Sequence, residues 1–173
     1  MIIVLMGYMA SGKSTIGKEL ADKLNFNFID LDDYIENREE CTIKEIFKSS
    51  GEIYFRKKET VYLEEVLNTT DKIVLSLGGG TPCYGRNMQL ISNASKVKSF
   101  YLKVSINNVL IRLENETTKR PLIAHIQSKD ELLEFIGKHM FERLQFYNEA
   151  QFNIDTDNTS LDAIVEEIVF KLF

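Results

Sequence analysis

The sequence predicts an α/β protein in which one parallel sheet of five strands lies between two layers of helices. Short apolar runs alternate along the chain with longer segments whose apolar residues recur every three or four positions. This alternation is typical of a parallel sheet covered on both faces, with ligands bound at the carboxyl ends of the strands. No repeat or linker interrupts the 173 residues, so we expect a single domain over residues 1–173.

Five short apolar runs predict the strands. The first run lies at the N-terminus, and it is too short and lacks the basic flank of a signal peptide, so we interpret it as a buried strand. The predicted strands are Ile2–Met6, Phe26–Asp30, Lys72–Ser76, Val97–Val104 and Phe152–Asp155.

Six segments with helical periodicity follow or separate these strands. They are Lys13–Leu24, Gly51–Leu67, Tyr84–Ile91, Ile106–Glu114, Glu131–Tyr147 and Leu161–Leu172. Residues 115–126 are the least periodic stretch of the chain, with a polar start and an interruption at Pro121. A stretch of this kind between two helices predicts a mobile lid over the site.

The composition of the chain indicates which binding partners and which cellular compartment to expect. The formal net charge is −5, which argues against nucleic acid or a membrane surface, since both attract a basic face. No apolar stretch is long enough to span a bilayer. Cys41 and Cys83 stand far apart, with no metal-binding or disulfide spacing, and we expect both to be reduced thiols. These features favour a cytoplasmic protein.

Residues 7–14 read GYMASGKS and match the phosphate-binding pattern GxxxxGK[ST] at every fixed position. Gly7 and Gly12 allow the backbone to wrap tightly and to turn its N–H groups toward phosphate oxygens at a helix N-terminus. Lys13 would reach the β- and γ-phosphates, and the Ser14 hydroxyl would bind Mg²⁺. The motif therefore predicts binding of a nucleoside triphosphate but does not identify what receives the phosphate.

Two carboxylates stand at the end of the second predicted strand. Alternation along a strand would place Asp30 and Asp32 on the same side, both facing the phosphate cleft. There a carboxylate can hold Mg²⁺-bound water or accept a hydroxyl proton during phosphoryl transfer. Acidic residues after a strand are also common helix N-caps, and that alternative stays open at this point.

Three weaker features complete the pattern. Arg56 and Glu59 stand one helical turn apart in the segment that opens with Gly51, so the carboxylate can orient the guanidinium. Three consecutive glycines, 78–80, follow the third predicted strand and leave bare backbone that a ligand can approach. Arg143 and Tyr147 close a late helix, four residues apart.

Taken in this order, these motifs resemble the shikimate kinase family. The family pattern is a phosphate loop, DxD after the second strand, FRxxE, GGG, a lid containing Arg-Pro-Leu, and RxxxY, and the chain shows all six between Gly7 and Tyr147. The resemblance implies a P-loop kinase fold and ATP-dependent phosphorylation of the shikimate 3-hydroxyl, on the route to chorismate and the aromatic amino acids. It also suggests a monomer, with shikimate and ATP as the substrates.

The resemblance implies roles residue by residue. Asp32 would contact the reacting hydroxyl as base or orienting group, Ser14 and Asp30 would hold one Mg²⁺ per subunit, and Arg120 would swing in with the lid. The residues implied to be catalytic are Lys13, Asp32 and Arg120. Those implied to bind ATP are Ala10, Ser11, Gly12, Lys13, Ser14, Thr15, Arg112 and Arg120, with residues 155–158 near the adenine. Those implied to bind shikimate are Asp32, Arg56, Gly78, Gly79, Gly80 and Arg143, the two arginines clamping its carboxylate.

The chain departs from the pattern at two positions. Ala10 stands where many relatives carry glycine, and Ser76 stands where other P-loop enzymes place a metal-binding aspartate. His125 and His139 lack ligand partners at suitable spacing, and we interpret both as solvated or structural. Alternative functions are a kinase for another small acceptor, such as gluconate or a nucleoside monophosphate, or a non-catalytic nucleotide-binding regulator.

Overall fold

The computed structural model describes residues 1–114, 123–126 and 128–173, and within them five parallel strands form one sheet of order β2-β3-β1-β4-β5. The strands are β1 (Ile2–Met6), β2 (Asn27–Asp30), β3 (Ile73–Ser76), β4 (Val97–Lys103) and β5 (Phe152–Asp155). This arrangement confirms the predicted parallel sheet.

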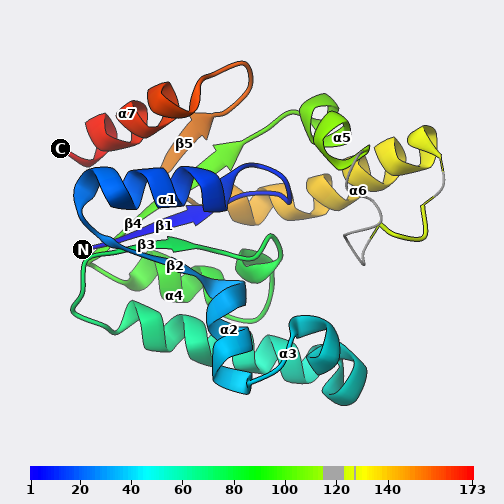
Figure 1. The fold of residues 1–173 in the computed structure, drawn as a ribbon, viewed down its shortest axis with the longest axis horizontal. Coiled ribbons are helices and arrows are strands. Elements are labelled where there is room, and N and C mark those ends of the chain that lie inside the picture. Colours follow the sequence, from blue (N-terminus) through cyan, green and yellow to red (C-terminus); the bar gives the residue numbers. More distant parts are fainter. Residues whose placement is uncertain (115–122, 127) are drawn as a thin grey trace.

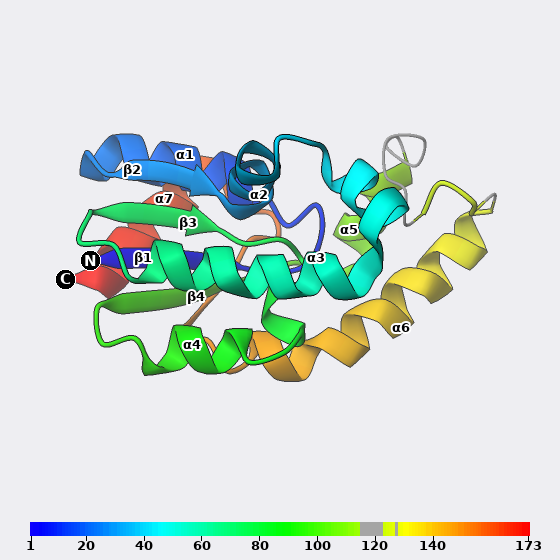
Figure 2. The same ribbon diagram turned by 90° about the horizontal axis from the view of Figure 1, so that it is seen from below.

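Helices cover both faces of the sheet, as predicted (Figure 1). Helices α1 (Lys13–Leu24) and α7 (Leu161–Leu172) lie over one face, and α3 (Ile43–Leu67) and α4 (Asn87–Asn93) lie over the other, in front of the strands in Figure 2. The remaining helical elements are α2 (Leu31–Glu39), the short 3₁₀ turn η1 (Thr81–Cys83), α5 (Ile106–Glu114) and α6 (Lys129–Tyr147). None of the helices in the described ranges is both long and apolar enough to cross a bilayer.

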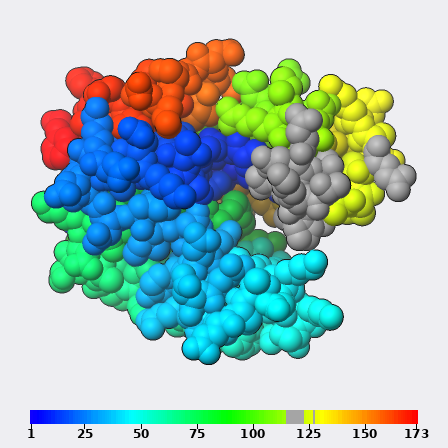
Figure 3. All heavy atoms as spheres, viewed as in Figure 1, coloured from blue at the N-terminus to red at the C-terminus, as the bar shows by residue number. Residues whose placement is uncertain are grey.

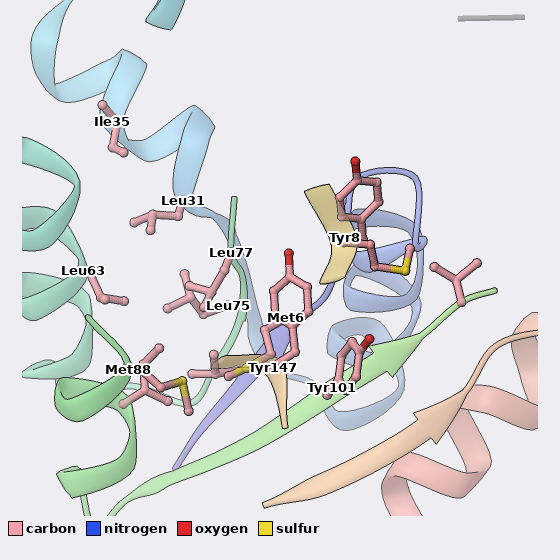
Figure 4. Packing of buried hydrophobic residues seen from close by; sticks show 14 of the residues in the cluster. Met6, Tyr8, Leu31, Ile35, Leu63, Leu75, Leu77, Met88, Tyr101 and Tyr147 are labelled. Atoms are coloured by element: carbon pink, nitrogen blue, oxygen red, sulfur yellow. The ribbon is translucent and has the colours of Figure 1, made fainter. Parts of the chain in front are cut away.

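The alternation of side chains along each strand divides the core into two clusters. In β1, Ile2, Val4 and Met6 join the cluster under α2, α3, α4 and α6. Ile3 and Leu5 face the opposite way and pack with residues of α1 and α7. All five side chains are fully buried. Figure 4 shows the first cluster, in which Met6 lies near the rings of Tyr101 and Tyr147. A central strand buried on both faces fixes the position of the loop that follows it.

The register brings the predicted motifs to one edge of the sheet. Ser76 of β3 is paired with Leu5 of β1 on one side and with Asp30 of β2 on the other. The segments that follow these strands therefore start level with one another. In the space-filling view of Figure 3, this end of the molecule also carries α5 and the start of α3 (cyan).

Residues 31–50 contain helical structure that was not predicted from the sequence. Helix α2 starts directly after Asp30, whose side chain caps it by accepting the Asp32 N–H, so Asp32 lies in a helix and not on an extended strand. Helix α3 starts at Ile43 behind a capping box formed by Thr42 and Glu45. Gly51, the predicted start of this helix, lies inside it and interrupts the helical backbone with φ 80° and ψ 173°.

The predicted lid, residues 115–126, lies for the most part outside the described residues, and Arg120 lies outside them entirely. Ile123 is described, and its side chain is fully buried in the cluster that α6 helps to form.

Candidate active site

The phosphate loop joins β1 to α1 and depends on backbone conformations that few residues adopt. Gly12 has φ 91°, in the left-handed region. At Gly7 a Cβ would come within 2.7 Å of the Leu102 carbonyl oxygen, so only glycine fits against β4. Ala10 has φ 59°, which explains why glycine is usual there. An L-residue in this conformation costs about 1–2 kcal/mol, and here alanine bears that cost.

Lys13 is buried at the first turn of α1 and points back into the loop. Its Nζ donates hydrogen bonds to the carbonyl oxygens of Gly7 and Tyr8, both at 2.9 Å. Arg112 of α5 reaches the same loop and donates from Nη1 to the Ala10 carbonyl oxygen at 2.6 Å. The carbonyl oxygens of the phosphate loop therefore hold both a lysine and an arginine side chain beside the site.

A cleft of about 600 Å³ opens over this loop. Helix α7 and the loop before it, through Thr156, Thr159, Leu161 and Ile164, form its far wall. The segment 155–158, expected near the adenine, contributes Thr156 to this wall. Its Asp157 carboxylate accepts hydrogen bonds from the Ser105 N–H and the Asn108 side chain at the start of α5. Thr159, Leu161 and Ile164 were missed, since nothing in their spacing distinguishes a cleft wall from a helix face packed on the sheet.

Ser14 and Asp30 meet at the floor of the cleft. The Ser14 hydroxyl donates to Asp30 Oδ2 at 2.7 Å, while Asp30 Oδ1 accepts the Asp32 N–H. A hydroxyl and a carboxylate oxygen beside a phosphate loop fit Mg²⁺, which takes few protein ligands and completes its shell with phosphate oxygens and water. Among the described residues there is no cluster of three or more His, Cys, Asp or Glu side chains suited to a metal.

Asp32 lies where the phosphate cleft meets a second pocket. Its side chain lines both cavities, together with Gly78 and Gly79. Burial raises the pKa of Asp32 to about 6, and the nearby carboxylates of Asp30 and Glu59 add to the shift. A carboxylate with a pKa in this range can accept a proton near neutral pH.

The second pocket, of about 700 Å³, is lined by apolar, cationic and acidic side chains from α2, α3, the glycine turn and α6. Its carboxylates are Asp32, Glu52 and Glu59. Arg56 and Arg143 both line it, and so do the three glycines 78–80. The aromatic wall is made by Phe47, Phe55 and Tyr84. A pocket with two guanidinium groups and apolar walls suits a small organic anion.

A network of hydrogen bonds fixes Arg56 at the pocket wall. Its Nη1 donates to Glu59 Oε2 at 2.9 Å, and Glu59 Oε1 accepts from the Thr81 hydroxyl at 2.7 Å. The guanidinium also stacks on Tyr84, with Cζ 3.7 Å from the ring centroid. At Gly80 a Cβ would come within 3.2 Å of Arg56 Nη2, so the glycine leaves room for this side chain.

Arg143 reaches the pocket from the opposite side, on α6. Its Nη1 donates to the His139 carbonyl oxygen one turn earlier, at 2.9 Å. Tyr147, one turn later, donates its hydroxyl to the Gly79 carbonyl oxygen at 2.5 Å. This bond ties the end of α6 to the glycine turn that lines the pocket, which gives the tyrosine of the motif a structural role.

His139, interpreted from the sequence as solvated or structural, also lines the second pocket. The Tyr8 hydroxyl and His139 Nδ1 are 2.8 Å apart. No motif signalled this contact, because the two residues are far apart in sequence and histidines on helices are mostly structural. His125 is exposed on the surface.

The structure therefore brings most of the predicted site residues together at one edge of the sheet. The phosphate cleft is lined by Ala10, Ser11, Gly12, Lys13, Ser14, Thr15, Asp30 and Arg112, and the second pocket by Arg56, Gly80 and Arg143, with Asp32, Gly78 and Gly79 lining both. A phosphate loop, an oxygen-ligand pair and a carboxylate facing a separate anion pocket define the class: a P-loop phosphotransferase acting on a small acceptor.

Comparison with known proteins narrows that class. The family model described as shikimate kinase matches residues 9–173, and the chain belongs to this family. A shikimate kinase of Flavobacterium johnsoniae is 45% identical over 167 residues, which cover 96% of each chain.

Solved structures agree with this assignment. The crystal structure of shikimate kinase from Bacteroides thetaiotaomicron superimposes with a TM-score of 0.89 at 36% identity, covering 99% of this chain and 97% of that one. Shikimate kinase from Acinetobacter baumannii in complex with shikimate gives a TM-score of 0.84 at 29% identity, covering 99% and 92%.

Proposed function

We propose that this protein transfers the γ-phosphoryl group of ATP to the 3-hydroxyl of shikimate, giving shikimate 3-phosphate and ADP. The observation that carries the proposal is the position of Asp32, which lines both the phosphate cleft and the anion pocket. Membership of the shikimate kinase family supports the identity of the acceptor. The reaction belongs to the route through chorismate to the aromatic amino acids.

In the proposed reaction, the acceptor hydroxyl oxygen forms a bond to the γ-phosphorus as the bond from that phosphorus to the ADP oxygen breaks. Asp32 accepts the hydroxyl proton. Its raised pKa, about 6, supports this role because the group is ionised at neutral pH yet basic enough to take a proton. Because phosphoryl transfer involves little covalent work by the protein, positioning and electrostatic stabilisation supply most of the rate.

The phosphate loop would bind the triphosphate through backbone N–H groups of residues 10–15 at the start of α1. Lys13 would exchange its bonds to the loop carbonyls for bonds to the β- and γ-phosphates. Arg112, anchored on the Ala10 carbonyl oxygen, would flank the nucleotide.

Ser14 and Asp30 would hold one Mg²⁺ per subunit, Ser14 directly and Asp30 through the hydration shell. When bound, the ion neutralises charge on the β- and γ-phosphates. Their hydrogen bond at 2.7 Å supports the assignment because it shows that the two oxygens reach a common point.

The shikimate carboxylate would be held between Arg56 and Arg143, which line the same pocket from opposite walls. A guanidinium presents paired donors that match a carboxylate. The Gly79 N–H would add a third donor, because Gly79 lines the same pocket.

We further propose one domain over residues 1–173, with residues 115–126 as its lid. Arg120, in that lid, would stabilise charge on the transferring phosphoryl, and arginines in this role are worth about 10³–10⁵ in rate. We propose a monomer that works in the cytoplasm without nucleic-acid or membrane partners. The net charge of −5 supports the last point, since both of those surfaces are themselves anionic.

The testing experiment measures ADP release by the purified protein with Mg²⁺ and ATP, with shikimate, with gluconate, and with no acceptor. We expect ADP release that depends on shikimate. Turnover with gluconate alone would preserve the kinase class but overturn the acceptor assignment. Tight ATP binding without turnover on either compound would favour the non-catalytic regulator or a different acceptor, such as a nucleoside monophosphate.

A further inference from the structure

One face of α6 carries three polar side chains at four-residue spacing. His139, Arg143 and Tyr147 follow one another on successive turns, so they share a face of the helix. Arg143, the middle member, lines the anion pocket together with His139. The two outer members are hydrogen-bonded to different segments at the carboxyl edge of the sheet, and these bonds determine where Arg143 lies.

The C-terminal member is joined to the glycine turn. Tyr147 is fully buried, donates its hydroxyl to the Gly79 carbonyl oxygen, and stacks on Tyr101 of β4 with ring centroids 5.1 Å apart. Figure 4 shows these two rings side by side beneath Tyr8. This end of α6 is therefore fixed on the sheet.

The N-terminal member is joined to the phosphate loop. His139 Nδ1 lies 2.8 Å from the hydroxyl of Tyr8, and the two rings meet edge to face with centroids 5.5 Å apart. Tyr8 is almost completely buried, and its own carbonyl oxygen accepts a hydrogen bond from Lys13 Nζ. A path of two hydrogen bonds thus connects the phosphate-binding lysine with the helix that carries Arg143.

The protonation state of His139 favours a stable hydrogen bond with the Tyr8 hydroxyl. Burial, together with the nearby charge of Arg143, lowers the pKa of His139 to about 4, so the imidazole is neutral at pH 7. Its Nδ1 can then accept a hydrogen bond from the Tyr8 hydroxyl, with the ring proton on Nε2. Within the described part of the chain, the Tyr8 hydroxyl has no other hydrogen-bond partner.

We propose that His139 is a positioning residue, which joins α6 to the phosphate loop through Tyr8 so that nucleotide binding at the loop strengthens acceptor binding at Arg143. This inference rests on the proposed function, because it assumes that Arg143 holds the acceptor carboxylate. The motif that ends α6 is accordingly HxxxRxxxY. Its histidine and tyrosine fix the helix to the phosphate loop and to the glycine turn, and its arginine binds the acceptor carboxylate.

The test measures the dissociation constant of shikimate by calorimetry, with and without Mg²⁺ and ADP, for wild type and Tyr8→Phe. The variant keeps the ring and loses only the hydroxyl. Since one neutral hydrogen bond contributes roughly 1 kcal/mol, we expect nucleotide-bound Tyr8→Phe to bind shikimate about 3- to 10-fold more weakly than nucleotide-bound wild type. Without nucleotide the two proteins should differ less, because the bond is proposed to carry the effect of the nucleotide. Affinity for ADP alone should stay within about twofold.

Four further variants separate positioning from general loss of structure. Tyr34→Phe is the matched control, since its hydroxyl bond to Glu65 (3.0 Å) lies outside both pockets, and it should leave shikimate binding unchanged. His139→Asn keeps an acceptor near the Nδ1 position and should retain most of the effect that His139→Leu loses. Tyr8→Phe combined with His139→Leu should be no weaker than His139→Leu alone, because both remove one bond.

Unchanged shikimate affinity in nucleotide-bound Tyr8→Phe, or additive losses in the double variant, would overturn the inference while leaving the proposed function intact. Wild-type protein that neither binds shikimate nor releases ADP in its presence would overturn the proposed function and this inference together.

Discussion

The Asp32 carboxylate lies directly against Gly78, where a Cβ would come within 2.9 Å of Asp32 Oδ1. Gly78 does not adopt a left-handed backbone, so alanine there would meet no conformational strain of its own. We predict that Gly78→Ala displaces the carboxylate and lowers kcat by about 10- to 100-fold, since small misplacements of a reacting group are costly.

The measurement is kcat at saturating ATP and shikimate, with the dissociation constant of ATP determined alongside. Gly137→Ala, on α6, is the matched control because the nearest atom to its added Cβ is 4.0 Å away. Equal kcat in Gly78→Ala and wild type would show that the position of Asp32 does not limit the reaction.

Asp32→Asn should abolish phosphoryl transfer while leaving ATP affinity nearly unchanged. The amide cannot accept the hydroxyl proton, and loss of a general base typically lowers the rate about 10²- to 10⁴-fold. ADP release and equilibrium ATP binding are the two measurements. Lys13→Ala is the reference for a variant that loses nucleotide affinity, and a similar loss in Asp32→Asn would place Asp32 on the nucleotide instead of the acceptor.

The pH dependence of kcat/KM for shikimate should report the ionisation of Asp32. Its pKa is raised to about 6, and only the ionised form can accept a proton. Below pH 6 the protonated fraction grows, so kcat/KM should fall about tenfold per pH unit, and above that value it should level off. A profile that stays flat down to pH 4.5 would contradict the role of base.

A site residue could be predicted from the sequence when its position depends on residues nearby in the chain. The phosphate loop, Asp30 and Asp32, and the glycine turn could be predicted because each lies within a few residues of a strand end. Arg56 lies inside α3 and was predicted from its spacing to Glu59 and from the FRxxE motif. The parallel sheet then brings those ends together. The Ser14–Asp30 pairing follows from the same geometry.

Contacts between distant segments were not predictable in this way. The bond between Tyr8 and His139 depends on how α6 crosses the end of the sheet, and no local pattern encodes that crossing. Strand alternation correctly predicted that Asp32 faces the phosphate cleft. The reason was wrong, however, because Asp32 lies in the first turn of α2 and not on a strand. The capping signals at Asp30 and Thr42 were present in the sequence and would have predicted the helices that were missed.

Arg143→Ala should mainly raise KM for shikimate. A carboxylate remote from the transferred phosphoryl is held similarly in the ground state and in the transition state, so its loss weakens binding more than turnover. Steady-state kinetics with varied shikimate at saturating ATP provide the test. A fall in kcat with KM unchanged would instead assign Arg143 to the chemical step.

Arg56→Ala should raise KM for shikimate and also destabilise the fold, which Arg143→Ala should do far less. Glu59 is 1% exposed and would lose its guanidinium partner at 2.9 Å. Breaking a buried ion pair by removing one member typically costs about 3–5 kcal/mol, because the remaining charge stays buried. The free energy of unfolding in urea and KM for shikimate are the two measurements.

The double variant Arg56→Ala with Glu59→Gln separates the two effects. Glutamine removes the buried charge and can still accept the hydrogen bond from the Thr81 hydroxyl, so most of the lost stability should return. KM for shikimate should stay as high as in Arg56→Ala, since the guanidinium is still missing. Recovery of KM together with stability would mean that Arg56 supports the pocket without binding the acceptor, leaving Arg143 as the carboxylate's guanidinium partner within the described part of the pocket.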